Sequence, residues 1–158
     1  MKRCSSKLCV VLVIVIAGFG TMASGDPAAG MKGTSRMKID PCSASLAGGK
    51  AKLNTTALRR DEAKYVGNYD IKVSPYFFKN EKGTLSFDVS DESLRKLAKG
   101  AVVDFGGRAV TSGTGKSRAV KVKVTPAGSG VANGSMTISI ATTNGELVFT
   151  TAYTFGGS

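Results

Sequence analysis

The chain of 158 residues contains no histidine and no tryptophan. Without an imidazole there is no Ser–His or Cys–His nucleophile pair, no histidine-ligated metal and no imidazole general base. Beyond the first 25 residues the only cysteine is Cys42. One cysteine excludes an internal disulfide and a zinc site built from cysteines in that part of the chain. The sequence therefore predicts no metal site and no cofactor.

The lone Cys42 has two interpretations. A free cysteine packs as a small apolar side chain and is usually buried. In an exported protein, an unpaired cysteine can also form a disulfide with a second chain. We expect burial, with the intermolecular disulfide as the alternative.

Acidic residues are few, with 11 Asp and Glu against 22 Lys and Arg and a formal net charge of +11. Three carboxylates, Asp70, Asp88 and Asp104, fall at polar positions of alternating segments, where solvated surface groups are expected. A carboxylate pair can hydrolyse a glycosidic bond, so a hydrolase of an envelope polymer stays open as an alternative. Because spaced aromatics for sugar stacking are also missing, we expect a protein that is not an enzyme.

A long apolar run occurs only near the N-terminus, where LCVVLVIVIAGF spans residues 8–19. Lys2 and Arg3 precede it, and the small residues Ala-Ser-Gly follow at positions 23–25. This is the layout of a secretory signal peptide, and the run is shorter than the roughly 20 residues of a membrane-spanning helix. We expect cleavage of residues 1–25 near Asp26, no membrane span after processing, and a secreted or periplasmic protein.

The rest of the chain divides into a leader and one domain. Residues 26–38 have no apolar period and are rich in Gly, Ala, Ser and Lys, which predicts a flexible leader. In residues 39–158, the sequence indicates a first strand at 50–56, a short helix at 57–67 and, from Tyr69 onward, strands that alternate apolar and polar residues. The helix with clear start and stop signals is predicted at 90–100, between an N-capping serine and a terminating glycine, and it is the one short helix of the expected fold.

One pattern occurs twice. KVSP at residues 72–75 recurs as KVTP at 123–126, and Gly83 and Gly134 follow at equal separation. Residues 69–107 and 119–157 are therefore predicted to be two related three-strand units, with the two glycines in turns at positive φ. Such units bury their apolar faces only by combining. We expect an antiparallel β-sandwich or closed barrel of about six to eight strands with one short helix.

Two groups of residues are candidates for binding. The basic residues Lys116, Arg118, Lys121 and Lys123 suit an anionic envelope polymer, or else they are solvated surface. The aromatic cluster Tyr76, Phe77 and Phe78 is either a buried cap over the core or an exposed contact with a protein or membrane. Nucleic acid is not expected as a partner, because no stacking aromatics are interleaved with the basic residues.

One motif resembles a nucleotide site. SGTGKS at residues 112–117 matches the end of a phosphate-binding loop, but the glycine that this loop needs five residues before Gly115 is Val110. A strand pattern also follows where a helix is needed, so a hairpin loop is predicted. The sequence as a whole favours an exported, non-enzymatic β domain with a binding or structural role in the envelope or outside the cell. An assembly subunit that pairs its edge strands with neighbours is the remaining alternative.

The signal-peptide assignment generates the first prediction. We expect exported protein to begin at Asp26 or within a few residues of it, because the small residues before that position fit the signal peptidase. N-terminal sequencing of the exported material measures this. Recovery of a chain that still starts at Met1 would contradict the assignment.

Overall fold

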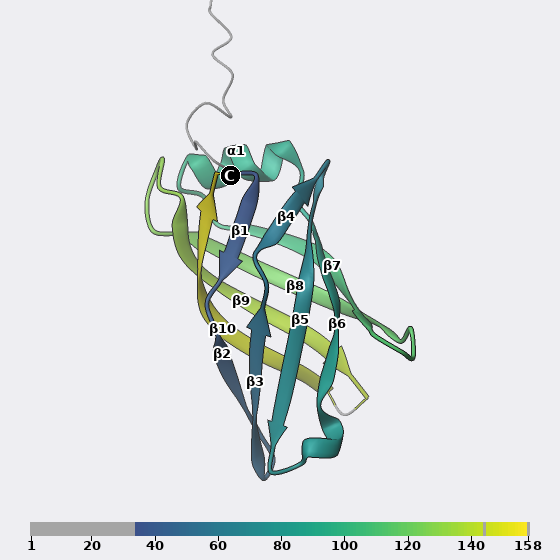
Figure 1. The fold of residues 1–158 in the computed structure, drawn as a ribbon. Helices are drawn as coiled ribbons and strands as arrows, with labels where there is room; N and C mark the ends of the chain where they lie inside the picture. Colours follow the sequence, from purple (N-terminus) through teal and green to yellow (C-terminus); the bar gives the residue numbers. More distant parts are fainter. Residues whose placement is uncertain (1–33, 144, 158) are drawn as a thin grey trace, which may run out of the picture.

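The computed structural model describes residues 34–143 and 145–157, so the predicted signal peptide and residues 26–33 of the predicted leader lie outside it. A single antiparallel sheet closes into a barrel, and one helix lies across one end (Figure 1). The strands are β1 (Arg36–Ile39), β2 (Cys42–Leu46), β3 (Gly49–Thr55), β4 (Leu58–Asp61), β5 (Lys64–Ser74), β6 (Glu81–Asp88), β7 (Val103–Thr111), β8 (Ser117–Pro126), β9 (Asn133–Thr142) and β10 (Gly145–Gly156), and the helices are the 3-10 helix η2 (Phe77–Lys79) and α1 (Asp91–Ala98).

The closed ring has eight strands, in the order β5-β4-β1-β10-β9-β8-β7-β6, and the β5–β6 pairing completes it. The remaining strands, β2 and β3, continue β1 and β4 beyond the ring, where β3 pairs with the second half of β5. In the described part of the chain β2 pairs only with β3. The prediction of an all-β fold with one short α-helix is confirmed, and the architecture is the closed barrel.

The barrel interior is filled by side chains, because every long strand buries alternate residues. Cys42 belongs to this core with 9% of its surface exposed, so the buried interpretation of the thiol holds. Burial raises the pKa of the Cys42 thiol, although a hydrogen bond with Thr151 opposes the shift. The largest fully buried side chains are Tyr65, Tyr153, Phe87, Phe149, Met37, Leu53, Leu58, Leu85, Leu97, Met136, Ile138 and Ile140.

Helix α1 forms where the sequence predicts it. The Ser90 hydroxyl accepts a hydrogen bond from the Ser93 N–H at 3.2 Å, which caps the first turn. Gly100 follows the helix at φ +83°, a backbone conformation that other residues rarely adopt. Leu94 and Leu97 point into the core, so the helix closes one end of the barrel.

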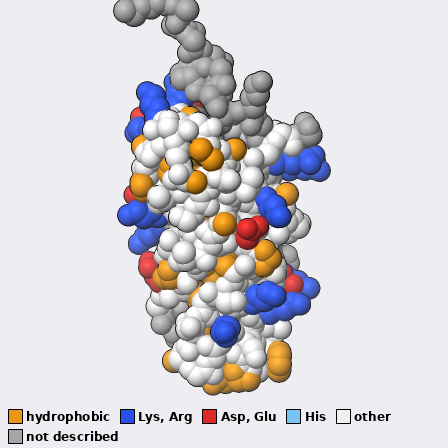
Figure 2. All heavy atoms as spheres, turned by 90° about the vertical axis from the view of Figure 1, so that its left-hand side faces the viewer, with side chains coloured by type: hydrophobic (Ala, Val, Ile, Leu, Met, Phe, Trp, Pro, Cys, Tyr) orange, Lys and Arg blue, Asp and Glu red, His pale blue; other side chains and the backbone are white. Residues whose placement is uncertain are grey.

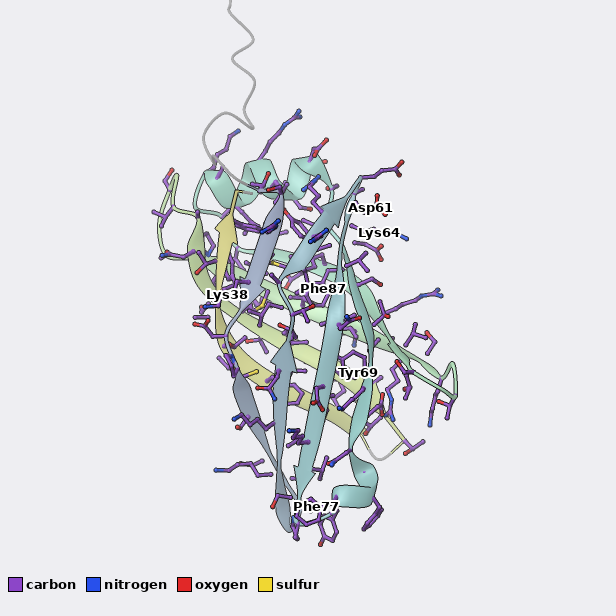
Figure 3. All side chains as sticks on the ribbon, viewed as in Figure 1. Lys38, Asp61, Lys64, Tyr69, Phe77 and Phe87 are labelled. Carbon is purple, nitrogen blue, oxygen red and sulfur yellow. The ribbon has the colours of Figure 1, made fainter. Side chains whose placement is uncertain are left out.

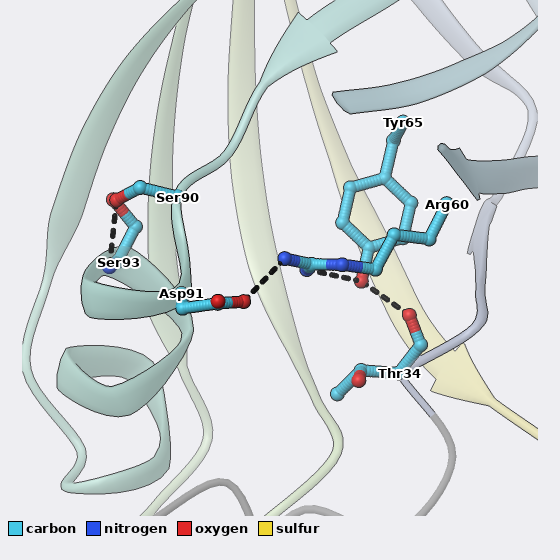
Figure 4. A network of polar contacts seen from close by, with 6 residues as sticks. All are labelled: Thr34, Arg60, Tyr65, Ser90, Asp91 and Ser93. Atoms are coloured by element: carbon cyan, nitrogen blue, oxygen red, sulfur yellow. Dashed lines mark hydrogen bonds and ion pairs between the residues drawn. The ribbon is translucent and has the colours of Figure 1, made fainter. Parts of the chain in front are cut away.

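Polar contacts fix α1 to the barrel (Figure 4). The Arg60 guanidinium of β4 donates to the Asp91 carboxylate at 2.6 Å, and it also lies over the Tyr65 ring. The Tyr65 hydroxyl in turn donates to the Thr34 carbonyl, just before β1. Three segments that are distant in the sequence therefore meet at the helix end.

The helix predicted at residues 57–67 is wrong. This segment is a hairpin of β4 and the start of β5, with Asp61 paired to Lys64 and Glu62 in the turn at φ +50°. Leu58 and Tyr65 are both fully buried. The charged residues between them favour a helix locally, but only a strand–turn–strand path places both side chains in the core.

The predicted boundary of the leader also changes. Residues 36–38 belong to β1, and Met37 is 1% exposed. Met37 and Ile39 alternate with exposed neighbours and pair with Phe155 and Tyr153 of β10. A four-residue strand is too short to give a clear period in the sequence, and its partner lies at the other end of the chain.

The two units of the predicted repeat are neighbours in the barrel. Residues 69–107 contain β6, α1 and parts of β5 and β7, and residues 119–157 contain most of β8 with β9 and β10. The ladder between β7 and β8 joins the two units. Their origin as two copies of one unit remains a prediction.

Gly83 and Gly134 have a structural role other than the predicted one. Both lie within strands and neither has a positive φ. A Cβ on Gly83 would lie 1.9 Å from the Val110 carbonyl oxygen, and one on Gly134 would lie 2.2 Å from the Thr125 carbonyl oxygen. Only glycine permits this close approach of strands where the barrel wall bends.

Substitution of these glycines tests the bending argument. We expect Gly83→Ala and Gly134→Ala each to lower the free energy of unfolding by about 2–4 kcal/mol, since the neighbouring strand must move away from the new methyl group. Gly106→Ala is the matched control, because a Cβ there has no atom within 4 Å. Urea denaturation measures all three. Equal effects at the three positions would contradict the argument.

Candidate functional site

The end of the molecule opposite α1 is formed by two adjacent connections (Figure 1). One is the β2–β3 turn, and the other runs from β5 through η2 to β6. The Val73 N–H donates to the Asn80 side-chain oxygen at 2.8 Å, and the Lys79 N–H donates to the Tyr76 carbonyl at 2.9 Å. These bonds hold η2 in a compact loop at the end of the sheet.

The three predicted aromatic residues divide between the core and the surface. Tyr76 packs against the core, whereas Phe77 is 71% exposed and Phe78 is 81% exposed. Phe77 lies at the extremity of the molecule (Figure 3). The Lys79 ammonium lies 5.1 Å from the centre of the Tyr76 ring and 6.0 Å from that of Phe78. The buried-cap interpretation therefore applies to Tyr76 but not to the two phenylalanines.

Three lysines lie on the strands at this end of the molecule. Lys50 and Lys52 of β3 and Lys72 of β5 point outward from the sheet, and Lys52 is directly opposite Lys72. Two like charges at opposing positions destabilise a strand pair. In the part of the chain that the structure describes, none of these three lysines, nor Lys79, has a carboxylate at ion-pair distance.

We call Phe77, Phe78, Lys50, Lys52, Lys72 and Lys79 together the basic-aromatic tip. Figure 2 shows hydrophobic side chains gathered at the same end of the molecule, with Lys and Arg side chains above them. The phenylalanines of the tip were candidates from the sequence, but most of its lysines were not. The alternation Lys-Ala-Lys at residues 50–52 places both lysines on one face of a strand. Only the pairing of β3 with β5 brings them next to Lys72.

The predicted basic residues lie elsewhere and are mostly matched by acidic ones. Lys116 is exposed in the loop of the β7–β8 hairpin. This loop contains most of SGTGKS, as predicted. Lys121 of β8 is 3.4 Å from Glu146, and Lys123 is opposite Asp104. The structure does not bring these lysines together with the aromatic cluster.

Arg118 differs most from its predicted role, because it points inward and is engaged by Glu81 at 2.6 Å. The Glu81 carboxylate also accepts hydrogen bonds from the Tyr69 hydroxyl at 2.6 Å and the Thr111 hydroxyl at 2.7 Å. Burial alone would raise the pKa of Glu81, but these bonds and the Arg118 charge together lower it. Burial and the bond to Glu81 raise the pKa of Tyr69 to about 12. Arg118 is therefore a structural residue.

The three carboxylates considered for hydrolysis do not form a common site. Asp70 is 3.8 Å from Lys82, and Asp88 is 3.7 Å from Lys64. Asp104 is exposed on the outer face of β7. Asp70 alone borders an open hollow, beside Gly83 and Lys82. Within residues 34–143 and 145–157, no cluster of three or more acidic or cysteine side chains is arranged to hold a metal ion.

No helix within residues 34–143 and 145–157 is long and apolar enough to cross a bilayer. The longest, α1, has eight residues, against the roughly 20 that a spanning helix needs.

The Glu81 contacts generate a pH prediction. A carboxylate with a lowered folded-state pKa stabilises the fold above its unfolded pKa of about 4.3, and this contribution is lost as the pH falls through the folded value. We expect Glu81→Gln to destabilise by about 2–3 kcal/mol at pH 7, since Arg118 loses its counter-charge. The difference from wild type should shrink steadily below about pH 4.

Urea denaturation of both proteins from pH 7 to pH 3 measures this difference. Asp88→Asn is the control, because Asp88 forms only an exposed pair with Lys64, which is expected to contribute less than about 1 kcal/mol. A gap between wild type and Glu81→Gln that stays constant with pH would contradict the assigned role of the carboxylate.

The site is thus defined by geometry: two exposed phenylalanines, and four lysines that form no ion pair with the described residues, at one end of a closed barrel. Comparison with family models, with curated proteins and with solved structures found no match.

Proposed function

We propose that this protein is an exported, non-enzymatic binding domain of the cell envelope or the cell exterior, and that it holds an anionic partner at its basic-aromatic tip. The observation that carries the proposal is the exposure of Phe77 and Phe78, at 71% and 81%, at the same end of the molecule as four lysines that have no carboxylate partner among the described residues. Loops on a rigid β scaffold commonly carry recognition. Phe77, Phe78 and Lys79 lie in such a loop, and the other three lysines lie on the strands that adjoin it.

The exposed rings and the opposed lysines of the tip destabilise the free protein, which supports a binding role. Burial of a phenylalanine side chain stabilises a fold by about 1.5–3 kcal/mol relative to exposure. Phe77 and Phe78 are both largely exposed, so neither contributes this stabilisation. The opposed Lys52 and Lys72 add repulsion. Both penalties are relieved if the tip meets a surface that covers the rings and neutralises the ammonium groups. Within the described fold they are offset only in part, by the contacts of Phe78 with Lys79 and with the Tyr76 ring.

A second candidate is an assembly subunit that pairs edge strands with other chains. It is favoured by the seam between β2 and β10. Among the described strands, β2 pairs only with β3, and residues 145–151 of β10 pair only with β9, whereas the Ala152 carbonyl accepts a hydrogen bond from the Asp40 N–H. Unpaired strand edges are templates for strand addition. This candidate predicts an oligomer in solution that does not depend on the lysines of the tip.

Charge reversal at two places tests the proposed function. We compare Lys50→Glu/Lys52→Glu at the tip with Lys121→Glu/Lys123→Glu on β8, which change the net charge equally. We expect the tip variant to elute from an anionic matrix at clearly lower salt than the β8 variant. Within residues 34–143 and 145–157, Lys50 and Lys52 form no ion pair, whereas Lys121 lies 3.4 Å from Glu146 and Lys123 is opposite Asp104. The measurement is the salt concentration at elution for both variants and wild type.

Two outcomes would contradict this assignment. Equal elution of the two variants would mean that net charge alone determines retention, and the tip would have no special role. Elution of wild type as an oligomer on size exclusion, with both variants unchanged in size and retention, would favour strand pairing. Circular dichroism of each variant confirms that the barrel is intact.

A further inference from the structure

The shape of the tip restricts the partners that it can fit. The barrel is elongated, and η2 and the β2–β3 turn form its narrow end, opposite α1 and the described ends of the chain (Figure 1). Phe77 lies at this extremity (Figure 3). The rings protrude from the end of the sheet and are largely exposed. A protruding apolar tip fits a soft, extended surface.

The chemistry of the tip requires two environments side by side. Phenylalanine has no hydrogen-bonding group, so the exposed rings gain most from contact with an apolar phase. The lysines need anions, and their alkyl stems can cover apolar surface while the ammonium groups reach water. A soluble polyanion neutralises the lysines but leaves both rings in water. The headgroup boundary of an anionic bilayer supplies both environments.

The spacing of the lysines matches the thickness of a headgroup layer. Lys50 is opposite Ser74, the last residue of β5, and Lys52 is opposite Lys72, two residues further from the tip. At about 3.3 Å per residue the two rows are about 7 Å apart. The headgroup layer on each side of a bilayer is roughly 5–8 Å thick. With the rings at the acyl boundary, the lysines of β3 and β5 lie on strands that lead away from the tip, on the side of the headgroups.

We propose that the partner of the basic-aromatic tip is an anionic lipid bilayer. Phe77 and Phe78 insert at the boundary between headgroups and acyl chains, and the four lysines contact the lipid phosphates. This inference rests on the proposed function and names its partner. The barrel stays outside the hydrocarbon and stands on the membrane surface by its narrow end.

The absence of tryptophan from the chain gives a direct test. Phe78→Trp in the protein without its signal peptide introduces a single fluorophore at the tip. Val148→Trp, on the outer face of β10 and 46% exposed in the native protein, is the matched control. Both proteins are titrated with vesicles of phosphatidylcholine, with and without about 30% phosphatidylglycerol, an anionic lipid. The readouts are the emission maximum and quenching by lipids brominated on their acyl chains.

We expect the Phe78→Trp emission to shift to the blue and to be quenched on anionic vesicles only, while the Val148→Trp emission stays unchanged. Addition of Phe77→Ser should weaken partitioning about tenfold, and addition of Lys50→Glu/Lys52→Glu should weaken it at least about 25-fold. Addition of Lys121→Glu/Lys123→Glu should have a much smaller effect. Binding should weaken steeply with salt.

Absence of a blue shift and quenching for Phe78→Trp on anionic vesicles would overturn the inference, as would equal changes for the control tryptophan. A parallel titration with soluble polyphosphate separates the two proposals. If polyphosphate binds with dependence on Lys50 and Lys52 while vesicles do not, the proposed function stands and the bilayer is the wrong partner. If neither binds through the tip, both proposals fall.

Discussion

Each long strand of this protein has one apolar face, and those faces leave water together only because the sheet closes on itself. The β5–β6 ladder and the β1–β10 ladder complete the ring. Closure turns a row of half-buried strands into a filled interior and removes most exposed edges. The short helix α1 is needed only to cover one end. The positions of the other elements follow from this closure.

The closed wall must bend, and glycines allow it. At Gly83 and Gly134 the carbonyl oxygen of the neighbouring strand occupies the space that a side chain would need. The tyrosines opposite them, Tyr69 and Tyr153, are almost fully buried. The hollows on the surface adjoin the same two glycines. We therefore attribute the hollows to the bends of the sheet.

The inward-pointing charged side chains of the barrel have specific partners, although the Arg118 Nε atom has none among the described residues. Glu81 is surrounded by donors and by the guanidinium of Arg118, so an inward-pointing charge is tolerated. At the other end, Arg60 joins β4 to α1 through Asp91. The lysines at the narrow end have no comparable partners among the described residues. This contrast is the physical basis for treating the tip as a surface that meets something else.

The sequence by itself determined the fold class, the capped helix after Ser90, and the alternation that sends Lys121 and Lys123 outward. These features depend on neighbours within a few residues, where period and capping are visible. Only the tertiary structure decided the rest. It turned residues 57–67 into a hairpin, because burial of Leu58 and Tyr65 outweighs local helix propensity. It also engaged Arg118 with a carboxylate from another strand and placed Lys52 opposite Lys72, because strand register joins residues whose proximity no local pattern in the sequence records.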